Sequence, residues 1–310
     1  MPKNNTKDSC SKQVRRRTVL KGAALGLTSL AIPAGSLNAS AWEAFFQKHY
    51  REMFADEKRD VIMRMEKEYE ETYDKKFNIK TTKPTAGVKF GYGLDISRCI
   101  GCRRCVYACV KENNQSRDPQ VHWISVLEFE KGEKWVNNFE ESTKYYNPHA
   151  VPEEGHFYMP VQCQQCENPP CVKVCPTKAT WKERDGIIVV DYNWCIGCRY
   201  CMAACPYGAR RFNWGKPRIK KKELNTDVHY LGNRPRYKGV VEKCTFCIQR
   251  TRENPGKYPA CVEICPVGAR KFGNLLDPKS EIRYCIDHKR VFRLKEDLNT
   301  FPKFFYFFAT

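Results

Sequence analysis

The chain has 310 residues, of which 42% are hydrophobic and 29% are charged, and this balance excludes a chain that is disordered throughout. It contains no run of about 18 apolar residues, so we do not expect its body to span a bilayer. The formal net charge is +19, and 18 residues are cysteine. So many thiols in one chain require either disulfides or bound metal.

The first 41 residues predict an export signal. Arg16 and Arg17 precede a weakly apolar segment, residues 22–33, and Ala39-Ser40-Ala41 has the A-x-A form of a cleavage site. The arginine pair resembles the twin-arginine type, whose substrates fold and acquire cofactors before export. We therefore expect cleavage after Ala41 and metal centres inserted before export. The alternative is a basic tail next to a short helix.

Residues 42–87 are expected to form a helical arm followed by a linker. Aromatic and aliphatic residues recur about every fourth position over residues 42–78, with Glu and Lys between them, which is typical of an amphipathic helix. Residues 79–87, which include Pro84, are expected to be the linker. The apolar face of the arm would pack on its own domain or clasp a partner subunit.

Sixteen cysteines fall into four quartets, of which the first and third have the spacing C-x2-C-x2-C-x3-C. The second is C-x2-C-x4-C-x3-C and the fourth is C-x2-C-x13-C-x3-C. A proline follows every quartet but the first, where Val110 stands instead. In chain order the quartets are Cys99, Cys102, Cys105 and Cys109; Cys163, Cys166, Cys171 and Cys175; Cys195, Cys198, Cys201 and Cys205; and Cys244, Cys247, Cys261 and Cys265.

These spacings indicate iron–sulfur clusters rather than zinc or disulfides. A C-x2-C-x2-C loop can wrap three thiolates around one [4Fe–4S] cube, and the cysteine after it is expected to open a short helix and ligate the neighbouring cube. Structural zinc uses separated C-x2-C pairs, and a disulfide scaffold gives no reason for one spacing to recur. Gly101 and Gly197 are expected where amides approach the inorganic sulfides closely. Every quartet is complete, so four [4Fe–4S] clusters are predicted.

Two insertions, residues 110–162 and 207–243, interrupt the cysteine-rich region. Residues 121–129 predict a strand, and His122, His149 and His156 lie in or near the first insertion. No C-x-x-C-H motif is present, so we favour surface or core histidines over haem or metal ligands. The second insertion carries a basic run over residues 216–222, expected to be a solvated loop or a contact with anionic headgroups or an acidic partner.

Residues 276–310 are expected to form a C-terminal tail. Its end, Phe301–Phe308, is almost entirely aromatic, and such a segment docks on its own core or on a partner. We favour a partner. Cys285 belongs to no quartet and is expected to be a buried free thiol.

The chain also repeats itself. Cys99-Ile100-Gly101-Cys102-Arg103 recurs as Cys195-Ile196-Gly197-Cys198-Arg199, and residues 170–176 echo residues 260–266. With these motifs, residues 88–275 resemble the four-cluster electron-transfer subunits of respiratory complexes such as dimethyl sulfoxide, polysulfide and tetrathionate reductase. The resemblance implies an α+β fold made of two ferredoxin-like dicluster units, with loop-rich insertions and the helical arm.

The resemblance further implies a pairing of the quartets, first with fourth and second with third. The implied ligand sets are Cys99, Cys102, Cys105 and Cys265 for cluster 1; Cys244, Cys247, Cys261 and Cys109 for cluster 2; Cys163, Cys166, Cys171 and Cys205 for cluster 3; and Cys195, Cys198, Cys201 and Cys175 for cluster 4.

The function implied by the resemblance is a non-catalytic relay of electrons. Its partners would be a polytopic quinone-handling membrane subunit and a molybdopterin or multihaem cytochrome subunit, on the periplasmic face of the membrane. The alternative is a free polyferredoxin that shuttles between partners. Four oxidised clusters with their thiolates carry about −8 in total, which offsets much of the basic excess and argues against nucleic-acid binding.

Overall fold

The computed structural model describes residues 55–132, 151–253 and 256–308. The predicted export signal, the first part of the arm (42–54) and part of the first insertion with His149 lie outside these residues. Within the described ranges, no helix combines the length and apolar character that a bilayer crossing demands.

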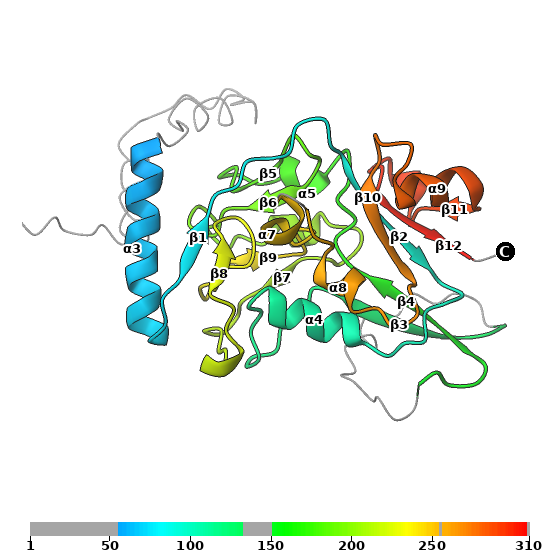
Figure 1. Cartoon of the computed structure of the whole chain (residues 1–310), viewed down its shortest axis with the longest axis horizontal. Coiled ribbons are helices and arrows are strands. Elements are labelled where there is room, and N and C mark those ends of the chain that lie inside the picture. The colour runs from blue at the N-terminus through cyan, green and yellow to red at the C-terminus, as the bar shows by residue number, and fades with distance from the viewer. Residues whose placement is uncertain (1–54, 133–150, 254–255, 309–310) are drawn as a thin grey trace, which may run out of the picture. The chain divides into compact units, whose positions relative to one another are not determined.

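Apart from the 19-residue helix α3, the helices and strands are short and are interspersed along the chain (Figure 1). In chain order they are α3 (Ala55–Tyr73), β1 (Asn78–Lys80), β2 (Phe90–Asp95), α4 (Arg104–Glu112), β3 (Ser125–Glu130), β4 (His156–Val161), α5 (Pro170–Lys173), β5 (Thr180–Lys182), β6 (Ile188–Val190), α6 (Tyr200–Ala203), β7 (Arg211–Phe212), η2 (Lys221–Glu223), β8 (Asp227–His229), β9 (Val241–Glu242), α7 (Ile248–Thr251), α8 (Ala260–Glu263), β10 (Arg270–Asn274), α9 (Glu281–His288), β11 (Val291–Phe292), η3 (Glu296–Leu298) and β12 (Phe304–Phe307).

Each cysteine quartet lies between two strands. β2, β4, β6 and β9 precede the four quartets, and β3, β5, β7 and β10 follow them. The strand after one quartet pairs antiparallel with the strand before the next, as β3–β4, β5–β6 and β7–β9. β10, after the fourth quartet, pairs antiparallel with β2, before the first. The strand pairings therefore link each quartet to the next and the fourth quartet back to the first. The mixed helix and strand content is that of two ferredoxin-like dicluster units.

The aromatic end of the chain is part of the core, so the expectation that it docks on a partner was wrong. β12 lies between β2 and β11 in a four-stranded sheet of order β10-β2-β12-β11, and α9 packs on β2 and β10. Phe304 is fully buried, and its ring stacks on that of Tyr92 with centroids 4.6 Å apart. Only the flanking Phe301 and Phe308 are exposed. Residues 276–308 thus complete the sheet that β2 begins, and Cys285, on α9, is a buried free thiol.

The described part of the arm packs on its own chain. Met65 and Tyr69 lie one turn apart on α3 and are buried in a cluster with Leu224 and Val228 of the second insertion. The Tyr69 hydroxyl donates a hydrogen bond to the backbone carbonyl of Pro235, 3.1 Å away. The helix ends at Tyr73, earlier than the expected residue 78. The expected linker, 79–87, begins inside β1, which pairs in parallel with β8.

Candidate iron–sulfur centres

A short helix positions the last two cysteines of every quartet. The third cysteine is always the second residue of a helix, namely α4, α5, α6 or α8. The fourth lies inside α4 in the first quartet and beyond the end of the helix in the other three, so it never opens the helix, contrary to the expectation from the spacing. Because side chains four residues apart share one helix face, about 6 Å apart along the axis, the two thiols can reach neighbouring cubes.

The proline after a quartet decides how far this helix continues. α5, α6 and α8 span four residues each and stop two residues before the fourth cysteine. A residue that precedes proline is disfavoured in the α conformation, which explains the stop. Val110 imposes no such limit, and α4 runs through Cys109 to Glu112 over nine residues. The missing proline thus lengthens the first helix while its thiols keep the same spacing.

Gly101 and Gly197, in the two binding loops, cannot carry a side chain, both because of their backbone conformation and because other parts of the protein lie close to them. Gly101 has φ +69° and Gly197 has φ +75°, a region that favours glycine. A Cβ on Gly101 would lie 2.4 Å from the Tyr158 ring, and one on Gly197 would lie 2.2 Å from the carbonyl oxygen of Gly239. The repeated glycine therefore lets a neighbouring segment cover each loop, a role beyond the close sulfide contact expected from the sequence.

The first and fourth quartets, Cys99–Cys109 and Cys244–Cys265, together form what we call the 1–4 unit, in which α4 packs against α8. A pocket between them is lined by thiols from both quartets, Cys99, Cys102, Cys105 and Cys265. One turn further along α4, Cys109 lies beside the thiols of Cys244, Cys247 and Cys261. The fold thus brings eight thiols into two groups of four.

The second and third quartets, Cys163–Cys175 and Cys195–Cys205, form the 2–3 unit, in which α5 packs against α6. Cys166 lies beside Cys163, Cys171 and Cys205, and Cys195 lies beside Cys175 and Cys198. All the described cysteines are free, so none of these close approaches is a disulfide.

Because the thiols are buried, they lose their protons and become thiolates near pH 7 only when a metal ion binds. Burial raises the pKa of Cys99 to about 11 and the pKa of Cys166 to about 12. A thiol with so high a pKa is neutral near pH 7 unless a positive ion stabilises the thiolate. Iron supplies such a charge and displaces the proton, so the donor set fits iron–sulfur clusters.

Hydrogen-bond donors surround the sulfur atoms. The Arg270 Nη2 group lies 3.2 Å from Cys105 Sγ, and the Arg210 Nη2 group lies 3.0 Å from Cys171 Sγ. Gln115 donates to Cys109 Sγ over 3.1 Å. Neither arginine was predicted from the sequence, although each ends a repeated Cys-Pro-x-Gly-Ala-Arg motif at residues 205–210 and 265–270.

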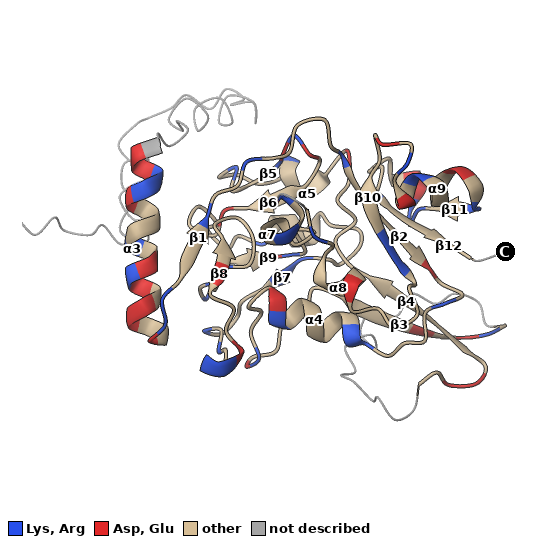
Figure 2. Cartoon of the chain, viewed as in Figure 1, with Lys and Arg blue, Asp and Glu red and all other residues tan. Residues whose placement is uncertain are grey.

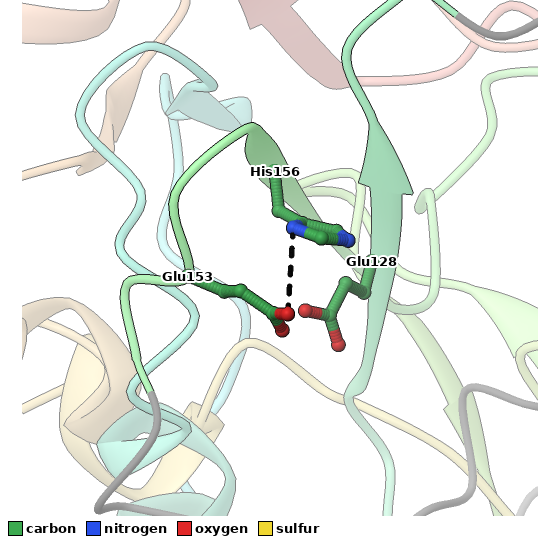
Figure 3. Close-up of side chains that lie close together, drawn as sticks. All are labelled: Glu128, Glu153 and His156. Atoms are coloured by element: carbon green, nitrogen blue, oxygen red, sulfur yellow. Dashed lines mark ion pairs between the residues drawn. The ribbon is translucent and has the colours of Figure 1, made fainter.

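Of the three histidines in or near the first insertion, the structure describes His122 and His156. Glu128, Glu153 and His156 converge beside the β3–β4 pair, with one potential ligand atom each within 4.8 Å of one another (Figure 3). Glu128 accepts a hydrogen bond from the Tyr158 hydroxyl, and both glutamates are exposed. We assign no metal to this cluster. Burial lowers the pKa of His122 to about 4, which keeps that ring neutral near pH 7.

The basic run in the second insertion is exposed to solvent. Lys216, Arg218, Lys220, Lys221 and Lys222 are exposed, and Figure 2 colours the ribbon at such Lys and Arg positions blue. Two of them already pair with acidic side chains, Arg218 with Asp118 at 2.8 Å and Lys221 with Asp74. Such exposed pairs contribute about 0–1 kcal/mol, so the run is a solvated surface, and its contact with a partner stays a hypothesis.

Two family models match the cysteine-rich region, and both describe a 4Fe-4S dicluster domain. One matches residues 98–179, and the other matches residues 155–237 and 229–275. Together with the four complete quartets, these matches establish that the chain carries four [4Fe–4S] clusters.

Curated relatives cover about the same region. The Hdr-like menaquinol oxidoreductase iron-sulfur subunit 1 of Archaeoglobus fulgidus is 40% identical over 245 residues, which are 70% of this chain and 82% of that protein. The iron-sulfur cluster-binding subunit of menaquinone reductase from Nitratidesulfovibrio vulgaris is 37% identical, with 71% and 88% covered. A polysulfide reductase subunit of Wolinella succinogenes is 37% identical, with 70% and 93% covered. The chain therefore belongs to the family of iron–sulfur subunits that includes those of dimethyl sulfoxide, polysulfide and tetrathionate reductase.

Proposed function

We propose that the chain is the electron-relay subunit of a respiratory oxidoreductase complex and has no catalytic site of its own. The burial of the thiols carries this proposal. All four thiols of the cluster 2 set are buried, and so are three of the four in the cluster 3 set. The cluster 1 and cluster 4 sets, which would lie at the two ends of the path, have only one buried thiol each, and Cys198 of the cluster 4 set is exposed. When bound, the clusters supply one-electron redox chemistry. The chain thus shields the middle of the path and leaves both ends near the surface, where partners exchange electrons.

The proposed ligand sets are those implied by the family resemblance. For cluster 1 the support is the pocket that Cys99, Cys102, Cys105 and Cys265 line together. For clusters 2 and 3 it is the grouping of Cys109 and Cys166 with three thiols each. Neighbouring thiols of different sets support the proposed order of clusters 1, 2, 3 and 4 along the path: Cys105 beside Cys261, Cys244 beside Cys163, and Cys201 beside Cys171.

We further propose the partners and the location. The relatives are named as subunits of a menaquinol oxidoreductase and of polysulfide and tetrathionate reductases. A quinone-handling membrane subunit and a catalytic molybdopterin or multihaem subunit are the partners that a relay of this kind needs. The predicted twin-arginine signal supports the periplasmic face of the membrane.

An exposed apolar surface supports a partner at the cluster 4 end. Ile196, Tyr200 and Trp214 are each at least half exposed, and the first two lie in and next to the loop that carries Cys198. Exposed apolar groups of this size commonly mark contact sites.

The relay is tested in the complex isolated anaerobically from native membranes. Cys198→Ser is expected to remove the cluster 4 signal from the electron paramagnetic resonance (EPR) spectrum and to stop quinol-linked electron transfer. Cys285→Ser, at a thiol in no quartet, is the matched control and is expected to change neither. Full electron transfer in Cys198→Ser protein that has lost cluster 4 would contradict the relay. Recovery of the wild-type chain as a lone soluble protein would favour the shuttling polyferredoxin.

A further inference from the structure

The buried basic side chains of the described structure fall into two classes. Four of them pair with a carboxylate: Arg234 with Asp191, Arg236 with Glu242, Arg252 with Asp185 and Lys303 with Glu167. The other three, Arg210, Lys243 and Arg270, have no carboxylate partner among the described residues. A buried charge is costly without a counter-charge. The ionisable groups around these three are mainly cysteine thiols, which become charged when they bind iron, and Lys243 also lies near Arg210.

Arg270 lies between clusters 1 and 2. Its guanidinium is hydrogen-bonded to Cys105 of the cluster 1 set, and it also interacts electrostatically with Cys261 of the cluster 2 set. The Tyr92 hydroxyl and the Gln162 side-chain oxygen, 2.9 and 3.0 Å from Nη1, fix its orientation. These neutral groups hold the side chain in place and leave its charge uncompensated.

Arg210 holds the equivalent place between clusters 3 and 4. Nη2 lies 3.0 Å from Cys171 Sγ of the cluster 3 set and donates to Thr180 Oγ1 over the same distance. The guanidinium also interacts electrostatically with Cys201 of the cluster 4 set. Its Nη1 atom is buried and has no hydrogen-bond partner among the described residues. An unsatisfied buried donor beside two thiol groups fits a site meant for an anion.

Lys243 lies at the remaining junction, between clusters 2 and 3. It is completely buried, and its ammonium group donates to the carbonyl oxygens of Ile188 and Cys244, the latter over 2.8 Å. Its thiol neighbours include Cys244 of the cluster 2 set and Cys163 of the cluster 3 set. The ammonium therefore joins β6 of the 2–3 unit to the first loop of the fourth quartet.

We propose that Arg270, Lys243 and Arg210 place one buried positive charge at each junction between consecutive clusters, and that each charge raises the reduction potentials of the two clusters beside it. This inference rests on the proposed relay and its ligand sets. One-electron reduction changes the charge of a cube with its thiolates from about −2 to about −3 and makes or breaks no bond. A nearby cation stabilises the more negative form, and it does so strongly where water is excluded.

The test is a potentiometric titration with dithionite, followed by EPR, of the anaerobically isolated full-length protein and its variants. Arg270→Gln is expected to lower two of the four potentials, and Arg210→Gln the other two. Lys243→Met is expected to lower one potential from each pair. Each shift should reach a tenfold change in the reduction equilibrium, which is about 59 mV for one electron. Clusters 2 and 3 would thus respond to two variants each, and clusters 1 and 4 to one variant each.

Matched variants separate the effect of charge from that of packing. Arg270→Lys and Arg210→Lys keep the charge and are expected to shift the potentials less than the Gln variants do. Lys303→Met makes the same change at a buried lysine whose charged neighbours are Glu167, Lys89 and Lys182, and it should leave all four potentials in place. The comparison of Lys243→Met with Lys303→Met remains decisive even if a Gln variant fails to assemble.

Three results would overturn the inference. They are unchanged potentials in variants that retain their full iron content, an equal shift of all four clusters in every variant, and a shift in Lys303→Met as large as in Lys243→Met. None of these results would contradict the proposed relay function. That proposal would be contradicted only if the wild-type protein lacked four clusters or did not pass electrons through them.

Discussion

The 1–4 unit and the 2–3 unit carry the same binding-loop motif on different scaffolds. In the 1–4 unit, β2 and β10 pair over five residues within a four-stranded sheet, and aromatic side chains such as Tyr92, Phe272 and Phe304 pack on them. In the 2–3 unit, β5 and β6 pair over three residues, and α5 and α6 span four residues each. The buried cluster around those helices consists of Cys171, Cys201 and Val241.

This contrast shows two ways to hold a pair of clusters. Around α5 and α6, two of the three buried apolar residues are themselves predicted ligands, so the metal supplies much of what a hydrophobic core otherwise would. The sheet of the 1–4 unit has an apolar core that extends well beyond its ligands and also takes in Ile187, Val189 and Tyr207 from the 2–3 unit, outside α5 and α6. Metal binding and folding are therefore expected to be coupled more tightly in the 2–3 unit.

The largest expected effect is that of iron removal. Anaerobic chelation should abolish hydrogen-exchange protection of the amides in α5 and α6, while the amides of β2, β10 and β12 keep much of theirs, because their core persists. Hydrogen exchange read by mass spectrometry on holo and apo protein measures this directly. Equal loss in both units would remove the distinction between their scaffolds, and the metal-loaded protein treated with the same buffer is the control.

A smaller effect is expected from giving the first quartet the proline of the other three. Val110→Pro removes a hydrogen bond inside α4 and crowds the preceding turn, which costs about 3 kcal/mol or more. Pro206→Ala, in the third quartet, is the reciprocal control and should cost much less, because α6 has already ended. Urea unfolding of the anaerobic proteins gives both values. A Val110→Pro protein as stable as the wild type would mean that the longer α4 is not needed in the 1–4 unit.

The smallest expected effect concerns pH and the second insertion, which lies between the third and fourth quartets. Burial lowers the pKa of His229 to about 4, and its ring accepts from the Leu231 amide over 3.1 Å. Because the folded state favours the neutral ring, this contribution to stability is present above about pH 6.5 and is lost as the pH falls toward 4. The expected slope for one such group is at most about 1.4 kcal/mol per pH unit.

His229→Gln should therefore flatten the pH dependence of the unfolding free energy as the pH falls from about 6.5 toward 4, measured by urea unfolding with the clusters intact. His156→Gln is the control, since that ring lies in the first insertion. If the slope of the His229→Gln protein equals that of the wild type, the insertion does not unfold together with the dicluster units.

The repeated features of the chain were readable from the sequence because their chemistry is local. Residues within one or two helical turns of each other predicted the four quartets and the short helix at each C-x3-C spacing. The same local patterns predicted the helix α3 and left Cys285 outside the quartets as a free thiol. Iron–sulfur ligation is such a feature, since its loops must wrap one cube within a few residues.

Features that depend on distant segments were decided by the tertiary structure. Phe301–Phe308 has the composition of a docking surface, and only pairing with β2, which lies far earlier in the chain, made part of it a core strand. Arg210 and Arg270 end a repeated Cys-Pro-x-Gly-Ala-Arg motif, but the sequence does not show that they are buried, and Lys243 has no such motif. All three are distinctive only because the fold buries them beside thiols of two quartets, with no carboxylate partner among the described residues. By itself, then, the sequence determined which clusters the protein carries, whereas the burial of the charges between them arises from packing between segments that lie far apart in the chain.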